Sequence, residues 1–290
     1  QFRFEFNDTM PDSFKTILIP VDLSINTEVA IKKALDIADE GTELHLLYVQ
    51  GYPSTGLSAF AQYFGAAHES SDEIIKDRIA QWKKSIEECT QNIRVHTWIS
   101  VNNSVQQAIE RKARQLGANL IVIAKNSKTG WLPYINRVLP DKIASNTGTA
   151  VLTVKPGSIY NKIRTVIVPV TDTTIKHKID IISIICKKFR VKIHLVTFVN
   201  NGPGIEDDSA SSLLHIYQWL KTSIHCPVEY AVLRGHNKAK SILAYAEKIN
   251  ADILLVHPET ETKIGWLDKH IVDVLSPASK MQVLAVEPAN

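Results

Sequence analysis

The segment Lys15-Thr-Ile-Leu-Ile-Pro-Val-Asp22 decides the fold of this chain, because it occurs twice. It reappears 149 positions later as Arg164-Thr-Val-Ile-Val-Pro-Val-Thr171. Each copy is a short apolar run rich in β-branched residues, which is typical of a parallel strand buried on both faces. Similarity at a fixed distance along a chain indicates an internal duplication.

Further pairs of segments extend this duplication in the same order. They are Leu44-His-Leu46 with Ile193-His-Leu195, Ala118-Asn-Leu-Ile-Val122 with Ala251-Asp-Ile-Leu-Leu255, and Val151-Leu-Thr-Val-Lys-Pro156 with Val283-Leu-Ala-Val-Glu-Pro288. The distance between copies falls from 149 to about 133 residues after the first of these pairs, so the first copy carries an insertion, which we place at residues 51–71. We therefore predict two domains, residues 14–156 and 162–288, after an N-terminal extension at residues 1–13.

Within each copy, short apolar runs alternate with stretches of helical periodicity. Residues 26–40 place alanines and Ile37 on one helical face, and Ile75, Ile79, Trp82, Ile86 and Cys89 form a second stripe. Five strands that alternate with four helices predict an α/β fold, namely two doubly wound, Rossmann-like, five-stranded parallel-sheet domains in tandem. In such sheets, ligands bind beyond the carboxyl ends of the strands.

The composition excludes several classes of protein. The chain has 290 residues, of which 44% are hydrophobic and 22% charged, so it is a globular chain rather than a disordered one. A net charge of +3 without a basic block argues against a nucleic-acid partner. The apolar run at residues 120–124 is far shorter than the ~20 residues of a membrane span. The three cysteines, Cys89, Cys186 and Cys226, predict free buried thiols in a reducing, cytoplasmic compartment.

Three motifs give the chain a resemblance to a known family. Ile19-Pro-Val-Asp-Leu-Ser24 follows the pattern of a first strand that ends in Pro-Val-Asp-x-Ser. Residues 44–47 match the second-strand pattern Leu-His-Leu-Leu, and residues 119–122 and 252–255 match the fourth strand. Over nearly its whole length the chain resembles the universal stress protein family. This resemblance implies a dimer through the last strands, which two copies in one chain would form internally, with a homodimer of tandem chains as a further possibility.

The resemblance also gives a test for ATP binding. ATP-binding members of the family carry Gly, two residues, Gly, nine residues and then Gly-Ser or Gly-Thr, because glycines let backbone N–H groups approach the phosphates. The first copy has Ala124, Ser127, Arg137 and Val138 at these positions. The second copy begins with His257 and Thr260, ends with neither Gly-Ser nor Gly-Thr, and has Thr171 in place of Asp22. Both phosphate motifs are therefore degenerate.

Two interpretations of the first-copy site remain open. In one, Lys125, Lys128 and Arg137 bind phosphate oxygens by charge-assisted hydrogen bonds while Asp22 contacts a ribose or adenine edge. In the other, the pocket is filled and these cations belong to a solvated loop. The candidate nucleotide- or ligand-binding residues are Pro20, Val21, Asp22, Ser24, Val49, Ala124, Lys125, Ser127, Lys128, Gly130, Arg137 and Val138.

No other motif points to catalysis or to a metal. His45 and His194 lie within predicted strands, where buried core histidines are more common than metal ligands, and the pair His257 and His270 has no third ligand at a supporting spacing. There is no G-x-S-x-G nucleophile motif. Together with the family resemblance, which implies a role in the stress response, the sequence therefore predicts a non-enzymatic module that has no certain cofactor and acts on an unidentified protein partner. The alternative is an ATP-binding switch with one site in the first copy.

Overall fold

The computed structural model describes residues 12–22, 24–50, 68–90, 92–125, 138–170, 175–199, 208–224, 226–264 and 269–287. The first half contains β1 (Thr16–Val21), α1 (Ile25–Ile37), β2 (Glu43–Gln50), α3 (His68–Cys89), β3 (Arg94–Val101), α4 (Val105–Leu116), β4 (Leu120–Ala124), α5 (Pro140–Thr147) and β5 (Ala150–Val154). After a short 3-10 turn, η2 (Pro156–Ser158), the second half contains β6 (Thr165–Pro169), α6 (Ile175–Lys188), β7 (Lys192–Val199), α7 (Asp208–Ser223), β8 (Val228–Arg234), α8 (Lys238–Lys248), β9 (Ile253–Val256), α9 (Ile271–Val274) and β10 (Gln282–Ala285). The candidate residues Ser127, Lys128, Gly130 and Arg137 lie outside the described ranges.

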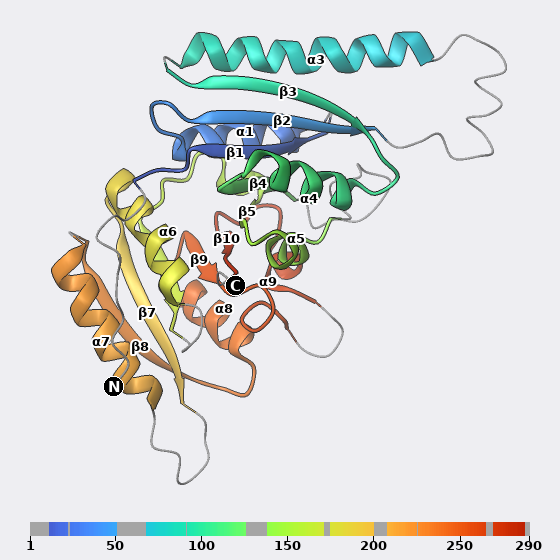
Figure 1. The fold of residues 1–290 in the computed structure, drawn as a ribbon. Helices are drawn as coiled ribbons and strands as arrows, with labels where there is room; N and C mark the ends of the chain where they lie inside the picture. The colour runs from blue at the N-terminus through green and yellow to red at the C-terminus, as the bar shows by residue number, and fades with distance from the viewer. Residues whose placement is uncertain are drawn as a thin grey trace.

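The strands form one continuous sheet with the order β3-β2-β1-β4-β5-β10-β9-β6-β7-β8 (Figure 1). All strand pairs within a half are parallel, and the two halves meet where β5 pairs with β10 in the antiparallel direction. Leu152 lies opposite Leu284 at the centre of this junction. The predicted α/β, doubly wound fold is confirmed, and the strand order of the second half mirrors that of the first.

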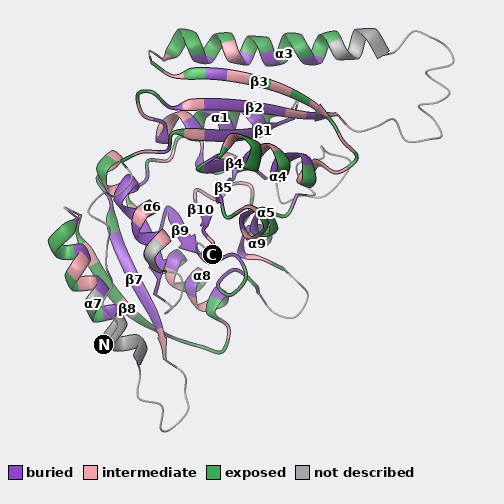
Figure 2. Cartoon of the chain, viewed as in Figure 1, coloured by how far each residue is buried: buried purple, intermediate pink, exposed green. Residues whose placement is uncertain are grey.

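Alternation along the strands divides the apolar side chains between two layers. Ile17 and Ile19 of β1 face a core that α1, α3, α6 and α7 cover, and this core runs through both halves without interruption. Leu18, on the opposite face of β1, packs with α4 and α5 of the first half. A separate cluster under α8 and α9 completes that second face. The central strands are accordingly buried along almost their whole length (Figure 2), as expected for a parallel sheet covered on both faces.

Some sequence predictions need local correction. The helix expected over residues 26–40 ends at Ile37, because Ala38 adopts an extended conformation. Ile75, Ile79, Trp82 and Ile86 are buried as predicted, but Cys89 is exposed at the end of α3. All three cysteines are free, and burial together with Cys226 raises the pKa of the half-buried Cys186. In the part of the chain that the structure describes, no helix has the length and apolar character needed to cross a membrane.

The junction between the halves predicts coupled effects of core mutations. Leu152→Ala and Leu284→Ala should each lower the free energy of unfolding by about 2–5 kcal/mol, because both side chains are buried. We expect the double variant to lose less than the sum of the two, since the residues are cross-strand neighbours in one core. Urea unfolding followed by circular dichroism measures these differences. The control is Leu46→Ala combined with Leu195→Ala, whose effects on the free energy of unfolding should add, because the two residues lie on strands far apart in the sheet. Additive effects of Leu152→Ala and Leu284→Ala would contradict the prediction.

Candidate functional site

The candidate site of the first half lies where β1 and β4 end. These two strands pair in parallel, with Leu18 opposite Ile121, so the residues that follow them emerge at the same edge of the sheet. Asp22 follows β1 and Lys125 follows β4. The structure thus brings both predicted polar residues to the edge at which doubly wound folds bind ligands.

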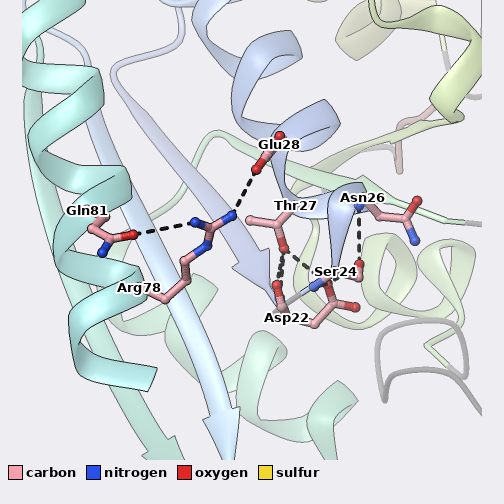
Figure 3. Close-up of polar contacts among 7 residues, drawn as sticks. All are labelled: Asp22, Ser24, Asn26, Thr27, Glu28, Arg78 and Gln81. Atoms are coloured by element: carbon pink, nitrogen blue, oxygen red, sulfur yellow. Dashed lines mark hydrogen bonds and ion pairs between the residues drawn. The ribbon is translucent and has the colours of Figure 1, made fainter. Parts of the chain in front are cut away.

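Asp22 is buried and organises the turn that leads into α1 (Figure 3). Its Oδ1 atom accepts hydrogen bonds from the backbone N–H of Ser24 at 3.1 Å and from the Ser24 hydroxyl at 2.5 Å. The hydroxyl of Thr27 lies 3.1 Å from the same oxygen and accepts the backbone N–H of Asp22 at 2.9 Å. Ser24 in turn caps the helix by accepting the N–H of Asn26. Among the described residues, hydrogen bonds are made to Oδ1 of Asp22 and none is made to Oδ2.

A second polar contact stands beside this turn. Arg78 of α3 donates to Glu28 of α1 at 3.1 Å and to Gln81 at 3.4 Å (Figure 3). Both members of the Arg78–Glu28 pair are about half exposed, and such surface pairs contribute little to stability. The Arg78–Glu28 pair therefore marks where the two helices approach one another rather than adding a buried charge to the site.

Lys125 is engaged with the other half of the chain. Its ammonium Nζ lies 3.0 Å from Oδ1 of Asp273, in α9, and only 8% of its side chain is exposed. Next to this pair, Lys155 is buried, and its Nζ has no hydrogen-bond partner among the described residues. Burial, and to a smaller extent the charge of Lys125, lowers the pKa of Lys155 to about 8. In this structure, Lys125 therefore forms part of the junction between the halves.

The remaining described candidates of the first half are apolar. Pro20 and Val21 belong to β1, Val49 and Val138 pack in the core beneath α4 and α5, and Ala124 ends β4, all of them buried. They contribute backbone and packing surface rather than side-chain chemistry.

In the second half, a buried ion pair occupies the corresponding edge. Nζ of Lys178, in α6, lies 2.7 Å from Oε2 of Glu261, and neither side chain is exposed to solvent. Lys178 also donates to the carbonyl oxygen of Pro169 at the end of β6, and Glu261 accepts the backbone N–H of His257 just after β9. Burial lowers the pKa of Lys178, while Glu261 opposes that effect. The carboxyl ends of β6 and β9 are therefore bridged by side chains of the chain itself.

Sequence reasoning did not identify Lys178 or Glu261. The available signal was that Lys178 stands three and four positions before Ile181 and Ile182, which are buried on the same face of α6. A charged residue on an apolar face needs a buried partner, but nothing in the sequence tells which acidic residue supplies it.

Two more polar contacts join the halves next to β5 and β10. Oδ2 of Asp141, in α5, lies 2.7 Å from Nδ1 of His270, and this hydrogen bond raises the pKa of His270. Ser145 donates to Glu287 at 3.1 Å. Nδ1 of His257 accepts hydrogen bonds from two backbone N–H groups of its own loop. His257 and His270 therefore each direct Nδ1 to groups of the chain itself rather than to a shared metal ion.

One group of metal-ligating side chains comes together in the described residues. Glu43 and His45 of β2 and His96 of β3 have donor atoms within 4.8 Å of one another. However, the indole N–H of Trp98 donates to Nδ1 of His45 at 3.0 Å. A neutral His45 therefore carries its proton on Nε2, the atom that lies 3.7 Å from Glu43. A metal would have to displace that proton, so this arrangement fits a buried neutral histidine, whose pKa is lowered by burial and by His96, better than a formed metal site.

Comparison with known proteins identifies the family. Residues 13–155 match the universal stress protein family. The chain belongs to this family. Across the whole chain, the fold is shared with a universal stress protein from Archaeoglobus fulgidus DSM 4304, at 14% identity and a TM-score of 0.66, covering 97% of this chain and 99% of that one.

Two further structures share the fold of this universal stress protein. A functionally unknown protein from Pseudomonas aeruginosa PAO1 has 16% identity and a TM-score of 0.56, covering 96% of this chain and 94% of that one. A putative universal stress protein from Pseudomonas aeruginosa UCBPP-PA14 has 15% identity and a TM-score of 0.53 with the same coverage. No curated protein matches the sequence. At these identities the structural matches establish the fold alone.

The buried Lys178–Glu261 pair predicts an asymmetric mutational response. Lys178→Met should lower the free energy of unfolding by about 3–5 kcal/mol, because it leaves the Glu261 carboxylate buried without its cation. Adding Glu261→Gln should recover a large part of that loss, since the amide removes the charge and still accepts the N–H of His257. Urea unfolding at pH 7 measures both. A double variant no more stable than Lys178→Met would contradict the prediction, and Lys83→Met, which removes one member of an exposed pair, is the control.

The Asp141–His270 contact predicts a pH-dependent contribution to stability. Because the pKa of His270 is raised in the folded state, its contribution is fully present below the unfolded value of about 6.5 and is lost as pH rises through the raised pKa. The stability difference between wild type and Asp141→Asn should therefore be larger at pH 5.5 than at pH 8, as measured by urea unfolding. Other histidines, such as His45, whose pKa is lowered, are present in both proteins. Their contributions to the pH dependence of stability therefore cancel in this difference.

The control for this titration is the same Asp141→Asn change in a His270→Gln background. There the difference should not vary between the two pH values, because the titrating partner is absent. A variation of equal size in both backgrounds would show that another group is responsible.

Proposed function

We propose that this universal stress protein is a non-enzymatic, cytoplasmic interaction module of the stress response that does not use ATP. Its membership of the universal stress protein family supports a role as a stress-response module. The observation that carries the rest is the Lys178–Glu261 ion pair, which bridges the ends of β6 and β9 where a ligand of the second half would bind. A ligand there would have to displace two buried, mutually neutralised charges.

The first half supports the same proposal through Lys125. Its ammonium is engaged by Asp273 of the second half, so a phosphate group would compete with a partly buried carboxylate for this cation. The position of the first family glycine holds Ala124, whose buried methyl group packs in the core. In this proposal, Lys125, a cation that could otherwise bind a phosphate group, instead holds the two halves together.

The tandem arrangement completes the proposal. β5 and β10 pair with each other, so the strands that would form a dimer interface between separate chains are used within one chain. The two halves then act as a permanent pseudo-dimer, and the surface they present together is the one offered to a protein partner.

A second candidate function is an ATP-dependent switch that uses the first half alone. The observation that favours it is Oδ2 of Asp22, which accepts no hydrogen bond from the described residues and lies at the carboxyl edge of the sheet next to a capped helix N-terminus. This alternative requires Lys125 to exchange Asp273 for a phosphate.

Thermal unfolding with magnesium and ATP at millimolar concentration separates the two functions. We expect ATP to raise the Tm no more than the same concentration of magnesium tripolyphosphate, which carries phosphates without adenosine, and we expect Asp22→Ala to leave this result unchanged. A ligand present at 100 times its Kd would add about 2.7 kcal/mol of stability, which such an experiment resolves. An adenosine-dependent, saturable rise that disappears in Asp22→Ala would overturn the proposal and establish the switch.

A further inference from the structure

A cavity whose lining carries several unpaired positive charges lies at the edge of the sheet opposite to the candidate site. A cavity of about 500 Å³ is bounded by the C-terminal part of α1, by the connection between the halves and by the turn between α6 and β7. Its lining includes five cations, Lys32, Lys162, Arg164, Lys188 and Arg190, and one carboxylate, Asp36. The strands β6 and β7 begin here, so this cavity is separate from the site at their carboxyl ends.

Some of these cations build the frame of the cavity. Lys188 donates to the carbonyl oxygen of Ala38, at the end of α1, at 2.5 Å and to Asp39 at 2.6 Å. The neighbouring Lys33 is buried and donates to the carbonyl oxygen of Asn161 at 2.8 Å, which fixes the connecting segment against α1. Lys32 pairs with Asp36. The walls are therefore held in place by contacts between the two halves.

The other cations have no internal partner. Lys162, Arg164 and Arg190 are exposed, and their side chains form no hydrogen bond or ion pair with the residues that the structure describes; Arg164 binds Asp252 only through its backbone N–H. The single carboxylate of the lining, Asp36, is already shared by Lys32 and Lys33. The cavity thus presents at least three uncompensated positive charges from segments far apart in sequence.

A second cavity, also of about 500 Å³, adjoins the first. Tyr160, Asn161, Lys162 and Arg164 line both, and Lys280 extends the basic lining of the second. Lys280 and Asn161 both bind Asp252, so the carboxylate in this part is neutralised. Lys162 and Arg164 therefore stand between two hollows and can be reached from either.

We propose that this basic cleft binds a small molecule that carries several phosphate groups. Cavities of 300–1,000 Å³ suit small ligands, and arginine guanidinium groups bind phosphate oxygens through paired, charge-assisted hydrogen bonds. The number of free cations matches a ligand with three or more negative charges better than a monocarboxylate. Because the lining comes from α1, the connecting segment and the second half, an occupant would bridge both halves, and the site is independent of the proposed function.

Isothermal titration calorimetry with inorganic tripolyphosphate in 0.15 M NaCl tests the proposal. We expect saturable binding with a stoichiometry of one per chain. The variant Lys162→Gln/Arg164→Gln/Arg190→Gln should weaken it by about 100-fold or more, since it removes the three free cations that would form charge-assisted hydrogen bonds with the phosphate oxygens. The variant should remain folded, because the three side chains are exposed and make no contact that supports the fold; an unchanged far-UV circular dichroism spectrum verifies this.

The matched control removes the same charge elsewhere. Lys76, Lys240 and Lys248 are exposed on α3 and α8, and changing all three to glutamine should alter the Kd less than twofold. Absence of saturable binding, equal loss in both triple variants or unaltered binding in the cleft variant would each overturn the proposal.

Two further titrations separate the possible sources of the phosphates and test their specificity. Competition by fructose 1,6-bisphosphate would indicate an organic bisphosphate, and tripolyphosphate binding without such competition would indicate inorganic polyphosphate. Sodium sulfate at equal ionic strength should displace neither tripolyphosphate nor fructose 1,6-bisphosphate. Full competition by sulfate would show that binding is unspecific attraction of anions and would overturn the proposal.

Discussion

Three residue pairs between β5 and β10, with Leu152 opposite Leu284 at their centre, join two parallel half-sheets into one. An isolated half would expose the backbone N–H and C=O groups of its last strand, which favours association with another strand. Antiparallel pairing satisfies these groups and buries the side chains of both strands, while the core beneath α1, α3, α6 and α7 extends across the junction. The position of every other element relative to the opposite half follows from this pairing.

The junction also determines what the carboxyl ends of the strands can do. It brings α5 and α9 close enough for Asp141 to reach His270, and it brings Asp273 to Lys125. Each of these contacts crosses between the halves and uses a side chain beside the carboxyl edge of the sheet, where doubly wound folds bind ligands. In the second half, Lys178 and Glu261 form a buried pair at the same edge within a single half. Charged side chains at this edge are thus bound to one another within the chain.

The two edges of the sheet differ in how their charges are balanced. At the carboxyl edge, the described charges are largely paired and buried, as Lys178 with Glu261 and Lys125 with Asp273 show. At the amino edge of the second half, Lys162, Arg164 and Arg190 face solvent around a cavity without a carboxylate of their own. Breaking a buried pair of the first kind leaves an uncompensated charge and destabilises the fold, whereas unpaired charge at the rim of a hollow attracts anions.

The repeat of residues 15–22 at residues 164–171 and the alternation of apolar stripes determined, by themselves, the fold class, the order of the elements and most of the core. Periodicity suffices for this because each strand and helix must bury one or two defined faces. The location of Asp22 and Lys125 at one edge of the sheet was also predictable, because neighbouring parallel strands have their carboxyl ends at the same edge. Local features were less accessible: Cys89 continues the α3 stripe in sequence but lies at the helix end, where solvent reaches it.

Only the tertiary structure decided which charges meet. Lys178 and Glu261 are 83 positions apart, and Lys125 and Asp273 are 148 apart, so no local pattern relates them. The same holds for the cations of the basic cleft, which come from α1, the connecting segment and the turn after α6. Hydrophobic periodicity fixes the faces that are buried, but electrostatic partners depend on distances of a few ångströms between elements, and those distances exist only once the halves have docked through β5 and β10.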